Sequence, residues 1–219
     1  IQGTGNLYWN RGMHLAWQSA VKVKEYDFYL WLNDDTILFK NALIELLKGG
    51  SKQIIVGTTQ SIRTNELTYG GYGTDNKLIS PSADGFLSCA YFNGNIVLVP
   101  HEIFLKVGFN DFRFRHALGD FDYGLRAGKA GFALVVAPGI SGYCEAHSRA
   151  PNWRNTEIPV YNRFVELYKP LGNNPFEFFV FDKRHNGLSN AIKHFFSIHL
   201  RVIFPDRKST RLNSSHGII

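Results

Sequence analysis

The sequence has little cysteine, a single methionine and no long apolar run. Its two cysteines, Cys89 and Cys144, lie in apolar surroundings, and two cysteines do not make the disulfide framework typical of small secreted domains. No stretch approaches the ~20 apolar residues that a membrane span needs. We therefore interpret both cysteines as reduced core residues, and we expect a cytoplasmic protein rather than a secreted or membrane-spanning one.

Charged residues are also scarce, at 19% of the 219 residues, and the net charge is +6. Residues 206–219 carry three Lys or Arg and one Asp, which is +2 of that total and leaves +4 for the rest of the chain. Without a long basic block, this excess is weak support for nucleic-acid binding and is compatible with a phosphorylated ligand or anionic lipid. We predict no nucleic-acid partner.

Both ends of the sequence differ from its body. Neither an initiator methionine nor a signal peptide precedes Ile1, and the chain starts as though a strand had just finished. Residues 206–219 have no apolar periodicity and resemble translated sequencing-adapter read-through. We interpret 206–219 as a non-native tail, a hypothesis that an intact genomic locus encoding the same tail would contradict.

Apolar periodicity alternates between the spacing of helices and that of strands along the body of the chain. It predicts helices over residues 12–23, 41–48, 101–107, 120–129, 162–168 and 186–203. It predicts strands over 26–32, 53–58, 95–99 and 132–137, and a glycine-rich hairpin over 67–77. Because there is no internal repeat and no clear linker, we predict one α/β domain over 1–160 with a helical C-terminal extension over 161–205.

The most informative segment is residues 26–36, an aromatic and apolar run that ends in Asn33, Asp34, Asp35 and Thr36. The run predicts a buried strand, so the acidic pair lies at its carboxyl end, where open α/β sheets bind ligands. Carboxylates this close repel one another unless a cation or a raised pKa relieves them. The segment therefore predicts a divalent cation, and with it an anionic ligand such as a phosphate.

A second acidic pair, Asp120 and Asp122, opens the helix predicted over 120–129. For this pair alone, helix capping and the helix dipole are the commoner explanation. His147 follows the strand predicted over 132–137, although a lone histidine is more often a surface or core residue than a metal ligand. Such positions suit a single cleft, but spacing alone leaves open whether the three groups converge.

Six short motifs follow one another between residues 3 and 150: GNLYWNRGM at 5–13, LNDDT at 32–36, NGN at 93–95, FND at 109–111, GDFDYGLR at 119–126 and EAH at 145–147. In this order they resemble the family 2 glycosyltransferases of the GT-A type, close to the rhamnosyltransferase-like bacterial branch. Each motif is weak alone, and the series is fairly specific. The resemblance implies a Rossmann-like mixed sheet flanked by helices, lacking the family's first strand, helix, strand and helix.

The resemblance implies an inverting glycosyltransferase of the hexosyl or deoxyhexosyl type. Its donor would be a nucleotide-diphospho-sugar, and its acceptor a hydroxyl of a glycan or of a lipid-linked molecule, in cell-surface polysaccharide or glycan synthesis. Residues 33–35 stand at the family's Asp-x-Asp motif, so Asp35 would hold Mg²⁺ or Mn²⁺ at the donor diphosphate, with Asn33 and Asp34 beside it. Asn33 replaces the usual first Asp and contributes no charge, which lowers the expected metal affinity.

Asp120 matches the family's catalytic base, which takes the proton of the acceptor hydroxyl. The family commonly has Glu before the base where this chain has Gly119, so the base stays open between Asp120 and Asp122. His147 matches a histidine that helps hold the metal or the diphosphate. Further substrate contacts are expected from Asn10, Arg11, Gly12, Asn93, Gly94, Arg126 and Trp153. Arg126 could equally be a structural ion-pair partner, and Trp153, like Trp9, Tyr69 and Tyr72, could equally be packing.

Residues 1–6 resemble the family's third strand, so we expect the chain as given to bind donor weakly and to have little or no activity. Two alternatives stay open: a non-catalytic carbohydrate- or nucleotide-binding remnant, in which Asn33 and Gly119 mark lost function, and a nucleotidyltransferase of similar layout.

Residues 182–204 mix basic and aromatic side chains at helical spacing. They would pack on the domain or make a peripheral contact at the inner face of the plasma membrane.

Overall fold

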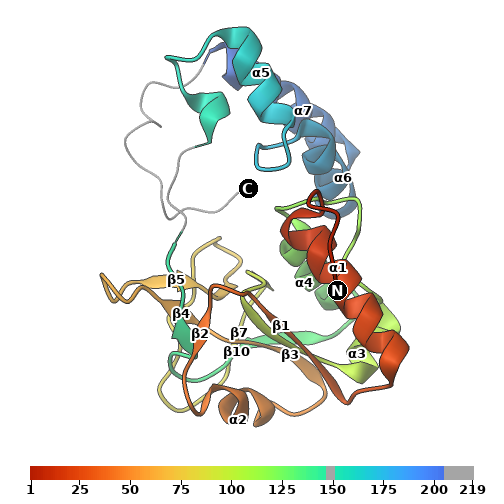
Figure 1. Ribbon diagram of the computed structural model, residues 1–219, viewed down its shortest axis with the longest axis vertical. Helices are drawn as coiled ribbons and strands as arrows, with labels where there is room; N and C mark the ends of the chain where they lie inside the picture. The colour runs from red at the N-terminus through yellow and green to blue at the C-terminus, as the bar shows by residue number, and fades with distance from the viewer. Residues whose placement is uncertain (147–150, 205–219) are drawn as a thin grey trace.

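The computed structural model describes residues 1–146 and 151–204 as strands in mixed sheets with helices around them (Figure 1). The helices are α1 (Tyr8–Val23), α2 (Ala42–Leu47), α3 (His101–Val107), α4 (Gly119–Lys129), the 3-10 turn η1 (Asn152–Arg154), α5 (Val160–Tyr168), α6 (Pro175–His185) and α7 (Leu188–Ile203). The strands are β1 (Phe28–Leu32), β2 (Ile37–Leu38), β3 (Gln53–Val56), β4 (Thr59–Gln60), β5 (Leu67–Tyr69), β6 (Gly71–Tyr72), β7 (Leu87–Ser88), β8 (Tyr91–Phe92), β9 (Ile96–Pro100), β10 (Ala133–Val136) and β11 (Gly142–Tyr143). His147 and the tail 206–219 lie outside the described residues.

The larger sheet has the strand order β1-β9-β3-β10-β7. Strand β9 is antiparallel to both β1 and β3, and β3 is parallel to β10. Strands β1, β3 and β10 therefore run in the same direction. Their carboxyl ends lie on the side of the sheet where the antiparallel strand β9 begins, and this side is called the sheet edge below. A second sheet, β2-β11-β4-β5, continues from this edge because β4 and β11 follow β3 and β10 in the chain. The mixed α/β class predicted from the sequence is confirmed.

The side chains of β1 point alternately to the two faces of the sheet, as the period-2 geometry of a strand requires, and each face packs against a separate hydrophobic cluster. Tyr29 and Trp31 join the aromatic cluster around Trp17 of α1, whose ring centroid lies 5.5 and 5.4 Å from theirs. Phe28 and Leu30 pack on the other face, in the cluster that contains Leu46 of α2. Helix α1 and helix α2 therefore cover opposite faces of the sheet (Figure 1).

The C-terminal helices α5, α6 and α7 lie together at one end of the molecule, beyond α4 (Figure 1). Their core includes Phe178, Phe181 and Ile198, and it also includes Leu118 and Phe121 from the start of α4. The C-terminal helices and α4 thus share one hydrophobic core. The division of the chain at residue 160 stays a prediction.

Two predicted elements are wrong, and helix α6, the turn η1 and the two-residue strands β2, β4, β7, β8 and β11 were missed. Residues 1–6 form no strand and are exposed, and α1 begins at Tyr8, four residues before the predicted start. The segment 67–77 is not one hairpin, because β5 pairs with β4 whereas β6 pairs with β8. Helix α6 was missed although Asn174 caps it by accepting from the Phe176 N–H (3.1 Å), with Pro175 at the first position.

The remaining predicted helices and strands are confirmed within a few residues at each end. In the described ranges, no helix has the length and apolar character required to cross a lipid bilayer.

Candidate active site

The end of β1 and the start of β9 are joined at the sheet edge, and α1 covers them. The Asn33 backbone N–H donates to the Asn95 carbonyl (3.1 Å), which continues the β1–β9 ladder past its last residue pair. The indole Nε1–H of Trp9 donates to Asn33 Oδ1 (2.6 Å). Asn33 is therefore held from two sides, and one lone pair of its side-chain oxygen is already used by the protein.

Asp35 is linked to the same edge through Cys144, the residue after β11. Cys144 Sγ lies 3.6 Å from Asp35 Oδ1 and 3.4 Å from Asn95 Nδ2. Burial raises the pKa of the Cys144 thiol, so the neutral thiol is the donor toward the carboxylate. Asp34 and Asp35 are themselves exposed. The prediction of reduced cysteines is confirmed, since Cys89 and Cys144 are both free thiols.

Asp120 is the second residue of α4 and points back to the start of β9. Its Oδ2 accepts from the Gly94 N–H (2.9 Å) and its Oδ1 accepts from the Phe121 N–H (2.9 Å). Burial raises the pKa of Asp120 to about 6, even though both hydrogen bonds act in the lowering direction. A partly exposed carboxyl group with a pKa near neutrality has the properties of a general base.

A local helix-start contact accounts for only one of the two hydrogen bonds of Asp120, the one from the Phe121 N–H. The residue before the helix is Leu118, buried and in the left-handed conformation (φ 69°), and it makes no side-chain cap. Left-handed backbone at a leucine costs of order 1–3 kcal/mol and is found mostly where a site requires it. The Gly94 contact joins Asp120 to the turn between β8 and β9, which a local cap would not do.

An aromatic wall, formed by Tyr72, Tyr91 and Phe121, stands beside Asp120. The rings of Tyr72 and Tyr91 are stacked (5.1 Å, 4°), and that of Phe121 lies 4.8 Å from Tyr91. Burial raises the pKa of Tyr72 to about 12, and the neighbouring charge of Asp120 acts in the same direction. Tyr91 and Phe121 are buried core residues, and of the three only Tyr72 is partly exposed, so Tyr72 alone could contact a sugar ring.

Asp122 lies two residues further on and is 0% exposed. It forms ion pairs with Arg126 (2.8 Å) and Arg184, and its Oδ1 lies 2.9 Å from His185 Nε2. Burial alone would raise the pKa of Asp122, but the hydrogen bond to His185 and the two arginine charges together lower it. Asp122 thus ties α6 to α4 and faces no open space, which separates it from Asp120.

Asn10 explains why glycine precedes Asp120. Its buried amide donates to the Asp111 and Phe114 carbonyls (both 2.8 Å) and accepts from Asn110 Nδ2 (2.6 Å). A Cβ at Gly119 would lie 1.9 Å from Asn10 Oδ1, so position 119 has no room for any side chain. The side chain of Asn10 is fully used inside the protein, and its predicted substrate contact stays a prediction.

The other residues of the first motif are also engaged within the protein or lack a neighbour. Arg11 Nε donates to the Phe112 carbonyl (2.9 Å), and its guanidinium lies 4.7 Å from the Phe112 ring centroid. Gly12 is in the middle of α1, where an added Cβ would meet nothing within 4 Å. No backbone conformation or close approach therefore requires glycine there.

The NGN motif contacts the β5–β6 segment and Trp9. The Asn93 N–H donates to the Gly70 carbonyl (2.9 Å), which connects the site to the β5–β6 segment. A Cβ at Gly94 would lie 2.3 Å from Trp9 Cη2, so glycine at this position lets the indole lie against the backbone.

Arg126 and Trp153 lie in packing positions. Arg126 donates to the Val107 and Phe109 carbonyls (2.7 and 2.8 Å) as well as to Asp122. Trp153 is 1% exposed and packs in the core shared by α4 and the C-terminal helices. For both residues the structure matches the alternative of packing or ion pairing that the sequence left open.

Metal ligands in the described part of the chain do not form a cage: no group of three or more His, Cys, Asp or Glu is assembled there. Mg²⁺ characteristically binds one or two carboxylates, several waters and substrate phosphates rather than an all-protein cage. The exposed carboxylates of Asp34 and Asp35, next to Asn33, fit that type of site. His147, the other predicted ligand, lies outside the described residues.

Sequence reasoning missed the parts of the site that join its ends. The sequence indicates stacking or packing for Trp9, a motif position for Asn95 and a core thiol for Cys144. The signals were present, since Asn95 lies in the NGN motif and Cys144 directly precedes EAH. What the sequence does not show is that these residues meet at Asn33 and Asp35.

No family model matches the chain, and no curated protein matches it. Among solved structures, the chain is similar to the crystal structure of GalNAc-T7 with UDP, GalNAc and Mn²⁺, at 9% sequence identity and a TM-score of 0.42. The match covers 90% of this chain and 43% of that chain, so this chain spans less than half the length of that protein. At this level, the likeness carries no argument about fold or activity.

Proposed function

We propose that the chain belongs to a glycosyltransferase of the GT-A type, family 2, that transfers a sugar from a nucleotide-diphospho-sugar to a hydroxyl acceptor. The observation that carries the proposal is Asp120, a partly exposed carboxyl group with a pKa of about 6 that is fixed against the start of β9. The motif order supports it, because the sequence expects a base at this position and a phosphate-binding acidic pair at the end of β1.

In this mechanism Asp120 takes the proton of the acceptor hydroxyl while that oxygen attacks the anomeric carbon of the donor. A bond forms between the acceptor oxygen and the anomeric carbon. The bond from that carbon to the diphosphate breaks, and the nucleoside diphosphate leaves with the electron pair. A single displacement without an enzyme nucleophile inverts the configuration at the anomeric carbon. Between the two carboxylates in the GDFDYGLR motif, Asp120 is assigned as the base because Asp122 is enclosed by cations.

Asp35 holds the donor side of the site. Together with Asp34 and Asn33 it would bind Mg²⁺ or Mn²⁺, which would offset the charge that develops on the leaving diphosphate. The Cys144 thiol fixes the direction of the Asp35 carboxylate through its contact with Oδ1. A role for His147 beside Asp35, the nature of the sugar and acceptor, and a cytoplasmic location stay predictions.

A non-catalytic binding protein of the same ancestry is the second candidate. It is favoured by Asn33, whose side-chain oxygen already accepts from Trp9 and brings no charge to a cation. Such a protein would bind a nucleotide-diphospho-sugar and would not turn it over.

The experiment compares wild type, Asp35→Ala, Asp120→Asn and the control Asp84→Asn in the gene product that contains this chain. Binding of UDP and dTDP with Mn²⁺ is measured by calorimetry, and nucleotide release from a panel of nucleotide-diphospho-sugars by a coupled assay. If the protein is a glycosyltransferase, Asp35→Ala should bind the nucleotide at least about tenfold more weakly than wild type does. The same function predicts loss of release by a factor of about 10² or more for Asp120→Asn, with binding kept. Turnover that survives both substitutions refutes the assignment, and binding without turnover in wild type favours the second candidate.

A further inference from the structure

The exposed side of α7 carries large apolar residues at regular intervals. They are Leu188, Ile192, Phe196, Leu200 and Phe204, and each is between 44% and 74% exposed. Residues four apart are offset by about 40° around the helix axis, so the four within α7, Leu188 to Leu200, form an apolar stripe that winds through about 120° over roughly 18 Å, and Phe204 follows at the C-cap. The opposite face of α7 is buried against the core through Ala191, Ile198 and Val202.

The apolar stripe continues onto α6. Phe176, at the start of α6, is 61% exposed, and its ring lies 5.6 Å from that of Phe195. The Phe195 ring in turn lies 5.7 Å from that of Phe196 in the stripe. Contiguous apolar surface of this kind is uncommon on monomeric proteins unless it binds something.

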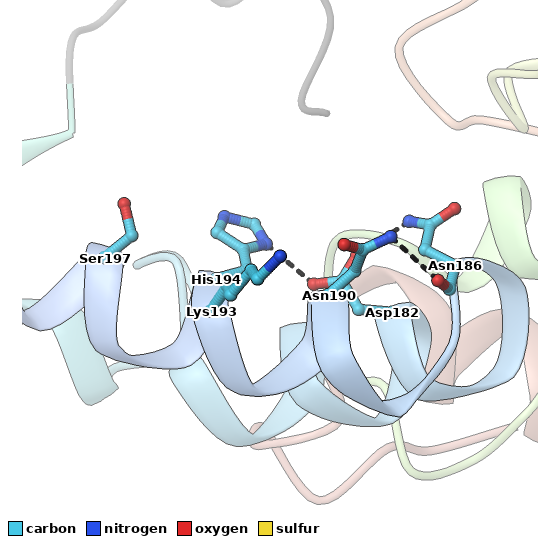
Figure 2. A pocket seen from close by; sticks show the side chains of 6 residues that line it. All are labelled: Asp182, Asn186, Asn190, Lys193, His194 and Ser197. Carbon is cyan, nitrogen blue, oxygen red and sulfur yellow. Dashed lines mark hydrogen bonds and ion pairs between the residues drawn. The ribbon is translucent and has the colours of Figure 1, made fainter.

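On α7 itself the side chains around the stripe are neutral or cationic, and Glu177, which follows Phe176 on α6, is paired with Arg115. From Leu188 to Phe204 the sequence has no Asp or Glu, while Lys193 and Arg201 are both exposed. Figure 2 shows Lys193 with Asn190, His194 and Ser197 along the polar flank of α7, around a shallow depression of about 450 Å³. The one carboxylate in this depression, Asp182, is buried and bonded to His194 (2.7 Å) and Asn186 (2.8 Å).

We propose that the apolar stripe docks this protein on the surface of a membrane that contains anionic lipids, with α7 lying in the plane of the interface. Phe196 and Leu200 enter the boundary between headgroups and acyl chains, and Lys193 and Arg201 face the lipid phosphates. In the described residues no helix could span a bilayer, which is consistent with a surface contact.

Charge selects this occupant over a second copy of the chain. Two stripes packed face to face would bring the Lys193 and Arg201 side chains of both copies together, with no acidic residue on either α7 to pair with them. An anionic lipid surface supplies the missing negative charge. The inference needs neither donor nor acceptor and therefore does not depend on glycosyl transfer.

The test is cosedimentation of the full chain with vesicles of phosphatidylcholine alone or of phosphatidylcholine mixed with phosphatidylglycerol. Phe196→Gln/Leu200→Gln removes apolar area from the stripe, and Lys193→Gln/Arg201→Gln removes its charge. Ile44→Gln/Leu105→Gln is the matched control, because these two residues of α2 and α3 are 59% and 65% exposed away from α7. Arg207→Gln/Lys208→Gln/Arg211→Gln separates the charge of the tail from that of α7. Circular dichroism verifies that each variant is folded.

Wild type is expected to partition onto the anionic vesicles. The stripe variant is expected to lose at least about tenfold in partition coefficient. The charge variant is expected to lose about fivefold per cation on anionic vesicles and nothing on neutral ones, and the control and tail variants are expected to match wild type. The proposal would be overturned if the stripe variant partitioned onto vesicles as strongly as wild type does. It would also be overturned if only the tail variant lost binding. A third contrary outcome is that wild type does not bind vesicles and is a dimer by sedimentation velocity, whereas the stripe variant is a monomer.

Discussion

Replacing Asp122 by asparagine keeps the outline of the side chain and removes its charge. In the folded protein this carboxylate is fully buried and contacts Arg126, Arg184 and His185. Asparagine has one acceptor oxygen and presents an NH₂ group in place of the other. At least one of the two arginines, whose side chains are only 22% and 23% exposed, then loses its partner within the protein.

The size of the effect follows from what the two arginines keep. Removing one partner of a buried ion pair costs about 3–5 kcal/mol because the other charge is left unpaired. Arg126 retains the Val107 and Phe109 carbonyls, and Arg184 retains Asp111. We therefore expect Asp122→Asn to lower the free energy of unfolding by about 2–4 kcal/mol, and the midpoint of thermal unfolding by roughly 5–15 °C.

The assay is urea unfolding followed by circular dichroism, with Glu45→Gln as control. Glu45 forms an exposed pair with Lys48 on α2, and its loss should change the free energy of unfolding by less than about 0.5 kcal/mol. A pH series adds a second check. Because the folded-state pKa of Asp122 is lowered, its stabilisation is present above the unfolded value of about 3.9 and is lost as the pH falls further. The difference in stability between wild type and Asp122→Asn should therefore begin to shrink below about pH 4 and should close only as the pH falls through the lower folded-state pKa of Asp122.

The opposite result has a definite meaning. If Asp122→Asn unfolds within about 0.5 kcal/mol of wild type at neutral pH and yet loses turnover, the ion pairs are not structural. Asp122 would then be the acid–base group, and the assignment of Asp120 would be reversed.

Three further outcomes are expected. Turnover should rise with pH through about 6, the pKa of Asp120, because the base acts when deprotonated, and a flat profile between pH 5 and 8 would contradict this. Gly94→Ala should destabilise the protein by about 1–3 kcal/mol in thermal melts, since the new Cβ meets Trp9, whereas the control Gly12→Ala should be neutral or slightly stabilising. Chelation with EDTA should abolish nucleotide release and added Mn²⁺ should restore it, with Asp35→Ala needing at least about tenfold more Mn²⁺; unchanged release after chelation would exclude the predicted metal.

The fold was predictable from the sequence where a local pattern of apolar residues, either a continuous run or a helical spacing, reports which residues are buried. Strands β1, β3, β9 and β10 are continuous apolar runs because helices or loops cover both of their faces. Helix α6 escaped because phenylalanines lie all round it, with Phe178 and Phe181 buried and Phe176 exposed, so it shows no clear helical stripe. Its signal was the Asn174–Pro175 start rather than its periodicity.

The site was predictable only in its parts. The two acidic segments could be placed at a strand end and a helix start because those positions depend on local patterns. Their connection depends on contacts between distant segments: Cys144 meets Asp35 across 109 residues and Asn95 across 49, and Gly94 meets Asp120 across 26. Strand order and direction determine which segments share the edge, and the local patterns of a single sequence do not reveal that order.

Gly119 shows how the structure changes the meaning of a departure from the family's pattern. As a missing glutamate, it counts toward lost function. In the folded chain the space at position 119 is occupied by the Asn10 amide, which holds the 110–114 loop through three hydrogen bonds, so a glutamate there would displace a buried network. Glycine is therefore what this packing of α1 against α4 requires, and it says nothing about catalysis. Of the two departures that favoured a non-catalytic remnant, Asn33 alone keeps its weight, and it lies on the metal side of the site rather than beside the base.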